Sequence, residues 1–249
     1  MTGPDLTLVI PVFNGAYALD DALPEIDDWR SGRSGQTFVL FVDDGSDDGT
    51  FDRLAGWVRE RADAKVVRLA ANHGLHTAMR AGFEHATTPL VATTEINIEH
   101  DPAEIDRMLT RMDEGIDVVC ARRVGRRDPW WRMAPSWAIN ALARWVGGVR
   151  IHDIHCLLKV WRREFALRAF ADASHGHFLR TLCEGNLAEV AVGFTRRRYG
   201  VSRFSIRALA RAFAQMFGAV VGFRFGMRPA HRHPTWFAVR EIVVSEKTP

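Results

Sequence analysis

The sequence predicts an α/β fold built on a mostly parallel sheet. Short β-rich runs alternate with helical patterns through the first 121 residues, which is typical of strands joined by crossover helices. Several runs, such as Leu6–Val12, are continuously apolar, as buried strands are. The chain has 249 residues, of which 47% are hydrophobic and 25% charged. It is therefore long enough for a large core and is not of disordered composition.

Five strands and four helices are expected in the first half. We predict strands at Leu6–Val12, Thr37–Val42, Lys65–Leu69, Leu90–Thr94 and Asp117–Ala121. We predict helices over Ala16–Trp29, from Thr50 through Arg61, over Leu75–Ala86, and from Pro102, a favoured first-turn residue. No linker composition or internal repeat interrupts this order, so we interpret these residues as one α/β unit.

The pattern is looser after Ala121. Arg122–Asp128 reads as a basic loop, Trp130–Trp145 as a helix, and His152–Trp161 as a turn that leads into a short strand. Further along the chain we predict helices over Arg163–Ala171 and Phe178–Glu184, a strand over Glu189–Phe194, a long amphipathic helix over Ser205–Phe223, and a terminal strand within Trp236–Ser245.

The two halves of the chain carry opposite charge. Residues 1–119 hold 10 Lys and Arg against 22 Asp and Glu, whereas residues 120–249 hold 23 against 8. The basic residues of the second half are almost all arginine, whose planar fork suits phosphate and carboxylate. This pattern indicates a bound anion, and the alternative is that the halves neutralise each other by packing together.

Cysteine content and hydropathy bear on the compartment. The three cysteines, Cys120, Cys156 and Cys183, are odd in number and widely spaced, which favours a reducing compartment such as the cytoplasm. The sequence shows no signal peptide, and no apolar run approaches the length of a membrane span. We therefore expect a cytoplasmic protein with no transmembrane segment.

Polar residues follow four predicted strands at their carboxyl ends, which meet at one edge of a parallel sheet. These residues are Asn14 and Gly15, Asp43 and Asp44, Asn72 to Gly74, and Glu95 to Asn97. Each loop alone is ordinary turn or helix-cap chemistry, but together they predict a ligand site. The chain has no Gly-x-Gly-x-x-Gly and no Gly-x-x-x-x-Gly-Lys sequence, so dinucleotide and P-loop binding are disfavoured. An Asp pair can instead accept hydrogen bonds from a base and ribose, while helix N-termini bind phosphate.

Several segments of the chain carry a resemblance to a known family. They are Pro11-Val12-Phe13-Asn14, Val42-Asp43-Asp44-Gly45-Ser46-Asp47-Asp48-Gly49-Thr50, Asn72-His73-Gly74, Arg123-x-x-Arg126-x-Asp128, Asp153-x-x-Cys156-x-Leu158-Lys159 and Arg197-x-Tyr199-Gly200. In this order they resemble the inverting family 2 glycosyltransferases of GT-A fold, and most closely the polyprenyl-phosphate branch. The resemblance covers roughly residues 5–215.

The resemblance implies a domain organisation and a reaction. A GT-A domain over residues 1–215 would have a nucleotide-sugar-binding half (1–121) and an acceptor-binding half (122–215), followed by a basic C-terminal extension (216–249). The enzyme would move a sugar from a nucleotide-diphosphate sugar, with inversion, in one displacement at the anomeric carbon. The acceptor implied by the family is polyprenyl phosphate. A soluble small molecule stays an alternative because no membrane anchor is predicted.

Site residues follow from the same resemblance. The donor would contact Pro11, Phe13, Asn14, Asp43, Asp44, Asn72 and Gly74, with Asp43 at the base. Glu95 and Asn97 would hold a divalent cation, Mg²⁺ or Mn²⁺, on the diphosphate, and Arg123 and Arg126 would bind the acceptor phosphate. A phosphate acceptor needs no general base, whereas a hydroxyl or amine does. For that role Asp153 comes first by position and His155 second.

Three positions depart from the family pattern. Glu95-Ile96-Asn97 replaces its Asp-x-Asp, Gly15 replaces a Glu, and His155 replaces a Gly. Hard cations prefer anionic oxygens, so we expect a weak or dispensable cation, with arginines and histidines carrying the phosphate charge. The candidate cationic residues are His73, His76, His100, Arg122, Arg123, Arg126 and His155.

Other functions stay open at this point. The departures equally permit a catalytically inactive or repurposed GT-A domain that only binds a nucleotide sugar or a protein partner. Nucleic-acid binding is disfavoured by the acidic first half. The amphipathic pattern of Ser205–Phe223 predicts either peripheral contact with the inner face of a membrane, or packing on the sheet or in a homodimer.

Overall fold

The computed structural model describes residues 5–97, 100–112, 115–125, 130–145, 148–172, 175–193 and 237–245, with positions 214, 217, 218 and 221. One sheet runs through it in the strand order β7-β5-β6-β4-β1-β2-β3-β8. The strands are β1 (Leu6–Val12), β2 (Thr37–Asp43), β3 (Ala64–Leu69), β4 (Leu90–Thr93), β5 (Val118–Val124), β6 (Lys159–Arg162), β7 (Leu187–Gly193) and β8 (Val239–Val244).

Most neighbouring strands of the sheet are parallel, as predicted. β1 pairs in parallel with β2 and β4, β2 with β3, and β5 with β7. The antiparallel strands are β6, which lies between β4 and β5, and β8, which pairs with β3. The predicted terminal strand therefore exists and extends the sheet at its β3 edge.

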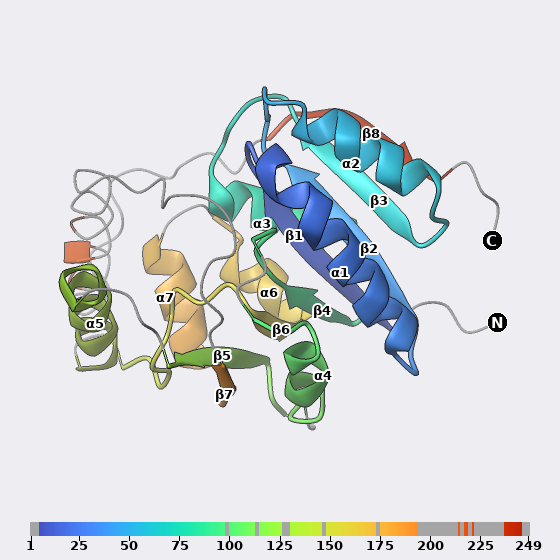
Figure 1. Cartoon of the computed structure of the whole chain (residues 1–249). Helices are drawn as coiled ribbons and strands as arrows, with labels where there is room; N and C mark the ends of the chain where they lie inside the picture. The colour runs from blue at the N-terminus through green and yellow to red at the C-terminus, as the bar shows by residue number, and fades with distance from the viewer. Residues whose placement is uncertain are drawn as a thin grey trace.

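Helices cover both faces of the sheet (Figure 1). They are the 3-10 turn η1 (Ala16–Ala18) and the α-helices α1 (Leu19–Gly32), α2 (Thr50–Arg59), α3 (Leu75–His85), α4 (Glu104–Leu109), α5 (Trp130–Trp145), α6 (Arg163–Ala169) and α7 (His175–Glu184). Apolar residues of α1, α2 and α4 join one core cluster, and those of α3, α6 and α7 join the other. Strand β1 feeds both clusters, because Leu8 and Ile10 face one and Val9 faces the other.

Strand β5 is longer than predicted. We predict a strand that ends at Ala121 and a loop over Arg122–Asp128, but β5 continues through Val124. Parallel pairing with β7, in which Arg122 lies opposite Ala191 and Arg123 opposite Val192, supplies the backbone partners for this extension. Both arginines are therefore strand residues, and Arg123 is held at a fixed register.

Some predicted features lie outside the described residues. Arg126 and Asp128 are among them, as is most of the predicted helix Ser205–Phe223, of which positions 214, 217, 218 and 221 are helical. In the part of the chain that the structure describes, every helix is too short or too polar to cross a membrane.

Candidate active site

The loops after β1 and β2 are joined by hydrogen bonds from backbone amides. The Asn14 amide donates to Ser46 Oγ at 2.8 Å, and Asn14 Oδ1 accepts from the Asp47 amide at 3.0 Å. Asn14 has a φ of 49°, a left-handed conformation that asparagine tolerates better than most residues. The Gly15 amide donates to Thr50 Oγ1 at 2.9 Å. The first two predicted loops therefore form one rigid corner.

Gly15 fits this corner for a steric reason. A Cβ at this position would lie 2.7 Å from Val12 Cγ1 and 3.4 Å from the Ile96 side chain. Such contact is far inside van der Waals distance, so a larger residue needs Val12 to move. The packing around position 15 therefore suits a glycine and leaves too little space for the glutamate of the family pattern.

Asp44 ties the second loop to the third. Its two carboxylate oxygens accept from the His73 and Gly74 amides, each at 2.8 Å. The Gly74 amide also lies 3.1 Å from Asn72 Oδ1. Burial raises the pKa of Asp44 above 3.8, although both amide bonds oppose that shift. Asp44 therefore fixes the backbone just before the first turn of α3. Asn72, in the same loop, is exposed.

Asp43 is fully buried at the end of β2. Its Oδ1 accepts from the Ser46 amide at 3.2 Å, and its Oδ2 lies 3.3 Å from Arg68 Nε. Both Oδ2 and that Nε are buried without a hydrogen-bond partner in the described structure. Burial raises the pKa of Asp43, while the Ser46 hydrogen bonds and the charge of Arg68 oppose this. An acceptor of this kind suits the N–H of a ligand, at the cost of shifting Arg68.

The segment Glu95-Ile96-Asn97 differs from a preformed cation site. Ile96 is buried, and Asn97 Oδ1 accepts a hydrogen bond from the Tyr17 hydroxyl at 2.7 Å. Among the described residues, no group of three or more His, Cys, Asp or Glu side chains is placed to hold a metal ion. Glu95 supplies a single carboxylate beside an amide oxygen that is already bonded to Tyr17. Among the residues that the structure describes here, one carboxylate and one neutral amide oxygen do not fit a resident Mg²⁺ or Mn²⁺ ion.

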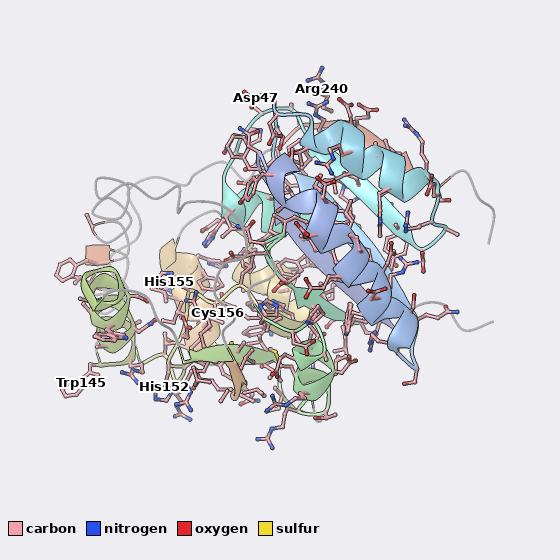
Figure 2. The ribbon with its side chains drawn as sticks, in the orientation of Figure 1. Asp47, Trp145, His152, His155, Cys156 and Arg240 are labelled. Atoms are coloured by element: carbon pink, nitrogen blue, oxygen red, sulfur yellow. The ribbon has the colours of Figure 1, made fainter. Side chains whose placement is uncertain are left out.

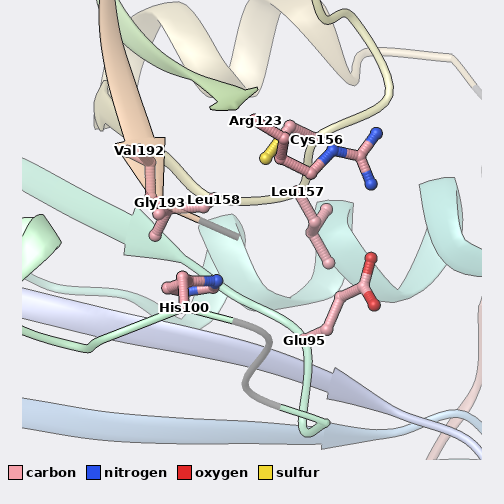
Figure 3. Close-up of a pocket in the computed structure, with 8 residues that line it drawn as sticks. All are labelled: Glu95, His100, Arg123, Cys156, Leu157, Leu158, Val192 and Gly193. Carbon is pink, nitrogen blue, oxygen red and sulfur yellow. The ribbon is translucent and has the colours of Figure 1, made fainter. Parts of the chain in front are cut away.

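A pocket of about 360 Å³, including its open mouth, lies beside Glu95 (Figure 3). It is lined by Glu95, His100, Arg123, Cys156, Leu157, Leu158, Val192 and Gly193. The carboxylate of Glu95 and the guanidinium of Arg123 lie on the same side of it. The ends of β5 and β7, the loop after β4 and the turn before β6 therefore meet around one hollow.

His100 is neutral in this pocket. Its Nε2 lies 3.0 Å from Thr94 Oγ1, and burial lowers the pKa of the imidazole to about 4. His100 therefore lies where expected, but the positive charge predicted for it is absent near pH 7. The other histidines of that prediction fall elsewhere, with His73 and His155 exposed.

Arg123 and Asp153 form a bidentate ion pair. Arg123 Nε donates to Asp153 Oδ2 at 2.7 Å and its terminal nitrogen donates to Oδ1 at 2.9 Å. Burial alone would raise the pKa of Asp153. The hydrogen bonds and the positive charge of Arg123 outweigh burial and hold the pKa of Asp153 below 3.8. Burial likewise opposes the charge on Arg123, whose pKa is nevertheless raised by Asp153. Both groups are ionised at neutral pH.

Side chains from three elements fix the turn that carries Asp153. Lys159, 3% exposed, donates from Nζ to the carbonyls of Ile154 (3.1 Å) and Cys156. Thr93 Oγ1 donates to the Leu157 carbonyl at 2.6 Å, and Asn140 Oδ1 accepts from the Ile154 amide at 3.2 Å. Lys159 interrupts the apolar run from Leu157 to Trp161, and that interruption was the available sequence signal for it.

The predicted site residues thus fall into two groups. Pro11, Phe13, Asn14, Asp43, Asp44, Asn72 and Gly74 surround the ends of β1, β2 and β3, whereas Glu95, Arg123 and Asp153 gather at the pocket beside β5. Tyr17 joins the two through Asn97 and was not predicted. Its partner lies 80 residues away, so no local pattern reveals the contact. His155 lies on the surface (Figure 2).

Residues 7–181 match the model of the glycosyl transferase family 2. The chain belongs to this family. Its relatives include the undecaprenyl-phosphate 4-deoxy-4-formamido-L-arabinose transferase of Pseudomonas paraeruginosa, 33% identical over 82% of this chain and 61% of that protein. Another is the dodecaprenyl-phosphate galacturonate synthase of Rhizobium johnstonii, 28% identical over 91% of this chain and 70% of that one. The resemblance to the polyprenyl-phosphate branch is therefore confirmed, although the chain spans only about three fifths of the first relative.

Solved structures of a glycosyl-transferring enzyme share the fold. Glucosyl-3-phosphoglycerate synthase from Mycobacterium tuberculosis, solved with Mn²⁺, UDP and glucosyl-3-phosphoglycerate, matches with a TM-score of 0.65 over 92% of this chain and 82% of that one. The same enzyme with UDP alone matches with a TM-score of 0.66 over 98% of this chain and 88% of that one. At 16% and 15% identity these matches confirm the predicted GT-A fold.

Proposed function

We propose that this family 2 member transfers a sugar from a nucleotide-diphosphate sugar to a polyprenyl phosphate, in one inverting displacement. Two of its relatives carry undecaprenyl phosphate and dodecaprenyl phosphate in their names, and a structural neighbour was solved with UDP. The single observation that carries the proposal is the bidentate pair of Arg123 and Asp153 at the pocket.

This pair favours an acceptor that is already anionic. A general base works best with a pKa near the operating pH and with an oxygen free to take the proton. Asp153 has a depressed pKa, and Arg123 donates to both of its oxygens. A hydroxyl or amine acceptor would lack a base here, whereas a phosphate oxygen attacks without one. Asp153 therefore acts as a positioning residue for Arg123.

The nucleotide occupies the corner formed by the first three loops. Asp43 offers an acceptor to the base, and the N-termini of α2 and α3 place their backbone amides and positive dipole ends at the same sheet edge. The sugar then lies between this corner and the pocket beside Glu95. Attack from the Arg123 side, opposite the departing diphosphate, inverts the anomeric carbon.

Different parts of the chain balance the charges of the departing diphosphate and of the acceptor phosphate in this proposal. Departure of a nucleoside diphosphate requires its growing negative charge to be balanced. Because the described donor set does not fit a resident cation, we assign part of that balance at the departing diphosphate to the N-termini of α2 and α3. Arg123 binds the acceptor phosphate on the opposite side, together with Arg126, which lies outside the described residues. A divalent cation is dispensable for donor binding under this scheme.

A second function is favoured by two of the same observations. The hydrogen bond between Tyr17 and Asn97 and the glycine at position 15 both depart from the family's catalytic pattern. They suit a domain that binds a nucleotide sugar without transferring it.

One experiment separates the two functions. The purified chain is incubated with UDP-, GDP- and CDP-sugars, with undecaprenyl phosphate, and with EDTA or Mn²⁺, and both donor binding and glycolipid formation are measured. Transfer that persists in EDTA supports the proposal. Donor binding without transfer to any acceptor supports the second function. Transfer to a soluble alcohol but not to polyprenyl phosphate contradicts the assignment of Asp153.

A further inference from the structure

The guanidinium of Arg68 lies against the buried carboxylate of Asp43. Arg68 Nε is 3.3 Å from Asp43 Oδ2, yet neither atom makes a hydrogen bond in the described structure, so the two charges meet without a bond. The Asp43 side chain is closed to solvent, whereas the Arg68 side chain is 19% exposed. A ligand that is to bond Asp43 Oδ2 has to reach a buried atom, and Arg68 is the member of the pair that can move toward solvent.

Two further contacts hold Arg68 in this place. Its terminal nitrogen donates to the Ser46 carbonyl at 3.0 Å, and its guanidinium carbon lies 4.5 Å from the centre of the Phe51 ring at the start of α2. A single hydrogen bond to a carbonyl and a single cation–π contact are both of modest strength. Arg68 can therefore leave this position when another anionic partner is within reach.

Strand β8 places such a partner beside Arg68. β8 pairs with β3 in antiparallel orientation, and Glu241 is the register partner of Arg68 (Figure 1). Val243 packs against the core cluster that contains Val66. Because side chains alternate along a strand, Glu241 and Arg68, each two residues from these positions, lie on that same face of the sheet. Opposite side chains on one face have Cβ atoms about 5 Å apart, so the guanidinium can reach the Glu241 carboxylate.

The pairing of β8 is irregular at this point. Arg68 is opposite Glu241 and Leu69 is opposite Val239, which leaves Arg240 as an extra residue in β8. Such bulges re-aim side chains and are common next to active sites. Glu241 is exposed, and within the described ranges its carboxylate makes neither an ion pair nor a hydrogen bond. It is therefore available to an arginine that turns away from the corner formed by the first three loops.

We propose that Arg68 is a positioning residue of the donor site that the nucleobase displaces: the base donates an N–H to Asp43 Oδ2, and Arg68 turns to Glu241. This inference rests on the proposed function, in which Asp43 contacts the base. Each charged group exchanges one partner for another. A buried carboxylate that loses its cation without a replacement is strongly destabilised, so Arg68 leaves when a ligand supplies the N–H.

The exchange makes the terminal strand part of the donor site. The predicted organisation assigns residues 216–249 to an extension beyond the glycosyltransferase domain, and β8 lies within that extension. Under this proposal the extension supplies the carboxylate that receives Arg68. Donor binding then depends on a residue more than 190 positions from Asp43, at the far edge of β3.

Nucleotide binding by the full chain tests the exchange. Calorimetry measures the affinity for UDP, for GDP and for inorganic pyrophosphate, which carries no base. The main variant is Glu241→Gln, at an exposed position where the fold tolerates the change. The matched control is Glu60→Gln, which removes the same charge at the opposite end of α2 from Phe51.

We expect Glu241→Gln to bind the preferred nucleotide about 3- to 5-fold more weakly, as the loss of one exposed ion pair predicts. Its pyrophosphate affinity should match that of the wild type, as should both affinities of Glu60→Gln. Loss of a carboxylate near an anionic ligand would by itself strengthen binding, so a weakening is specific to the displaced Arg68. Glu241→Asp should restore most of the nucleotide affinity.

Arg68→Met supplies the second arm. This variant should retain nucleotide binding, and Arg68→Met/Glu241→Gln should bind as Arg68→Met does, because no arginine is left to receive. Thermal melting shows whether Arg68→Met is folded; if it is not, the comparison of Glu241→Gln with Glu241→Asp decides alone. The proposal is overturned by an unchanged nucleotide affinity in Glu241→Gln, by equal weakening for nucleotide and pyrophosphate, by loss of nucleotide binding in folded Arg68→Met, or by a wild type that binds neither nucleotide.

The outcome is separable from that of the proposed function. Transfer to undecaprenyl phosphate is measured in parallel with the same variants. Transfer by a protein whose nucleotide affinity is insensitive to Glu241 leaves the proposed function standing and removes the role of Arg68. Nucleotide binding that depends on Glu241, without transfer to any acceptor, supports the exchange and contradicts the transferase.

Discussion

Arg123 donates to both carboxylate oxygens of Asp153, at 2.7 and 2.9 Å, across 30 residues of sequence. Both side chains are largely shielded, at 17% and 10% exposure. Removing one member of such a pair leaves the other charge buried without compensation, which typically costs about 3–5 kcal/mol.

The first prediction concerns this pair. Asp153→Asn and Arg123→Met should each lower kcat/KM for the acceptor by about 100-fold, because each loses a charge-assisted hydrogen-bond pair. The double variant should lose much less than the product of the two. Steady-state kinetics over pH 6–9, joined to a double-mutant cycle, measures this.

The shape of the pH profile decides the role of Asp153. A positioning residue leaves the profile of Asp153→Asn parallel to that of the wild type. If Asp153 were a general base poised near the operating pH, the wild type would show an acidic limb within the measured range that Asp153→Asn lacks, and that difference would contradict the positioning role.

The second prediction concerns Lys159. Lys159→Met should raise the acceptor KM strongly, because the variant loses a buried positive charge that acts on Asp153, along with two bonds to the turn that carries Asp153. Its free energy of unfolding should fall by about 2 kcal/mol. The matched control is Thr93→Val, which removes the bond to the Leu157 carbonyl in the same turn without a change of charge. If both variants raise the acceptor KM equally, the role of Lys159 is only structural.

The third prediction concerns His100 and pH. Its pKa of about 4 in the folded chain lies below the value of 6.5 for an exposed histidine. Between these values the unfolded chain binds more protons, so stability falls as pH drops from 6.5 toward 4. This group alone should lower the free energy of unfolding by about 2 kcal/mol between pH 7.5 and pH 5. Urea unfolding of the wild type and of His100→Gln measures it, and an identical pH dependence of the two proteins would rule it out.

The fourth prediction concerns Tyr17 and Asn97. Donor affinity of the wild type, measured by calorimetry, should change little between EDTA and Mn²⁺. The described segment offers one carboxylate and one neutral amide oxygen that already accepts a hydrogen bond from Tyr17. Tyr17→Phe/Asn97→Asp releases that oxygen and adds a carboxylate, so donor binding should become dependent on Mn²⁺. Tyr17→Phe alone serves as the control. A wild type whose donor binding vanishes in EDTA would refute the arrangement.

Sequence patterns were sufficient for the parallel part of the sheet. β1 to β4 follow apolar runs, such as Leu6–Val12, that each end in a polar loop, and both signals are local. The corner formed by Asn14, Asp43 and Asp44 was predictable for the same reason, since parallel strands bring their carboxyl ends to one edge.

Features that depend on distant partners were not predictable. β5 extends past Ala121 because β7 pairs with it, although its two arginines interrupt the apolar pattern. The bond between Tyr17 and Asn97 joins positions 80 apart. The neutrality of His100 depends on burial by elements far along the chain, and nothing in its neighbouring residues signals it.

The position of β6 has a consequence for how the chain is assembled. This strand comes from the later part of the chain, yet it is hydrogen-bonded to both β4 and β5 of the earlier part. A fragment that stops at residue 124 would leave β5 with neither β6 nor β7 beside it, and the wall that holds Arg123 could not form. The corner formed by the first three loops and the pocket beside Glu95 are therefore not modules that selection or engineering can exchange separately. During synthesis the pocket cannot close until residues beyond 187 have been made.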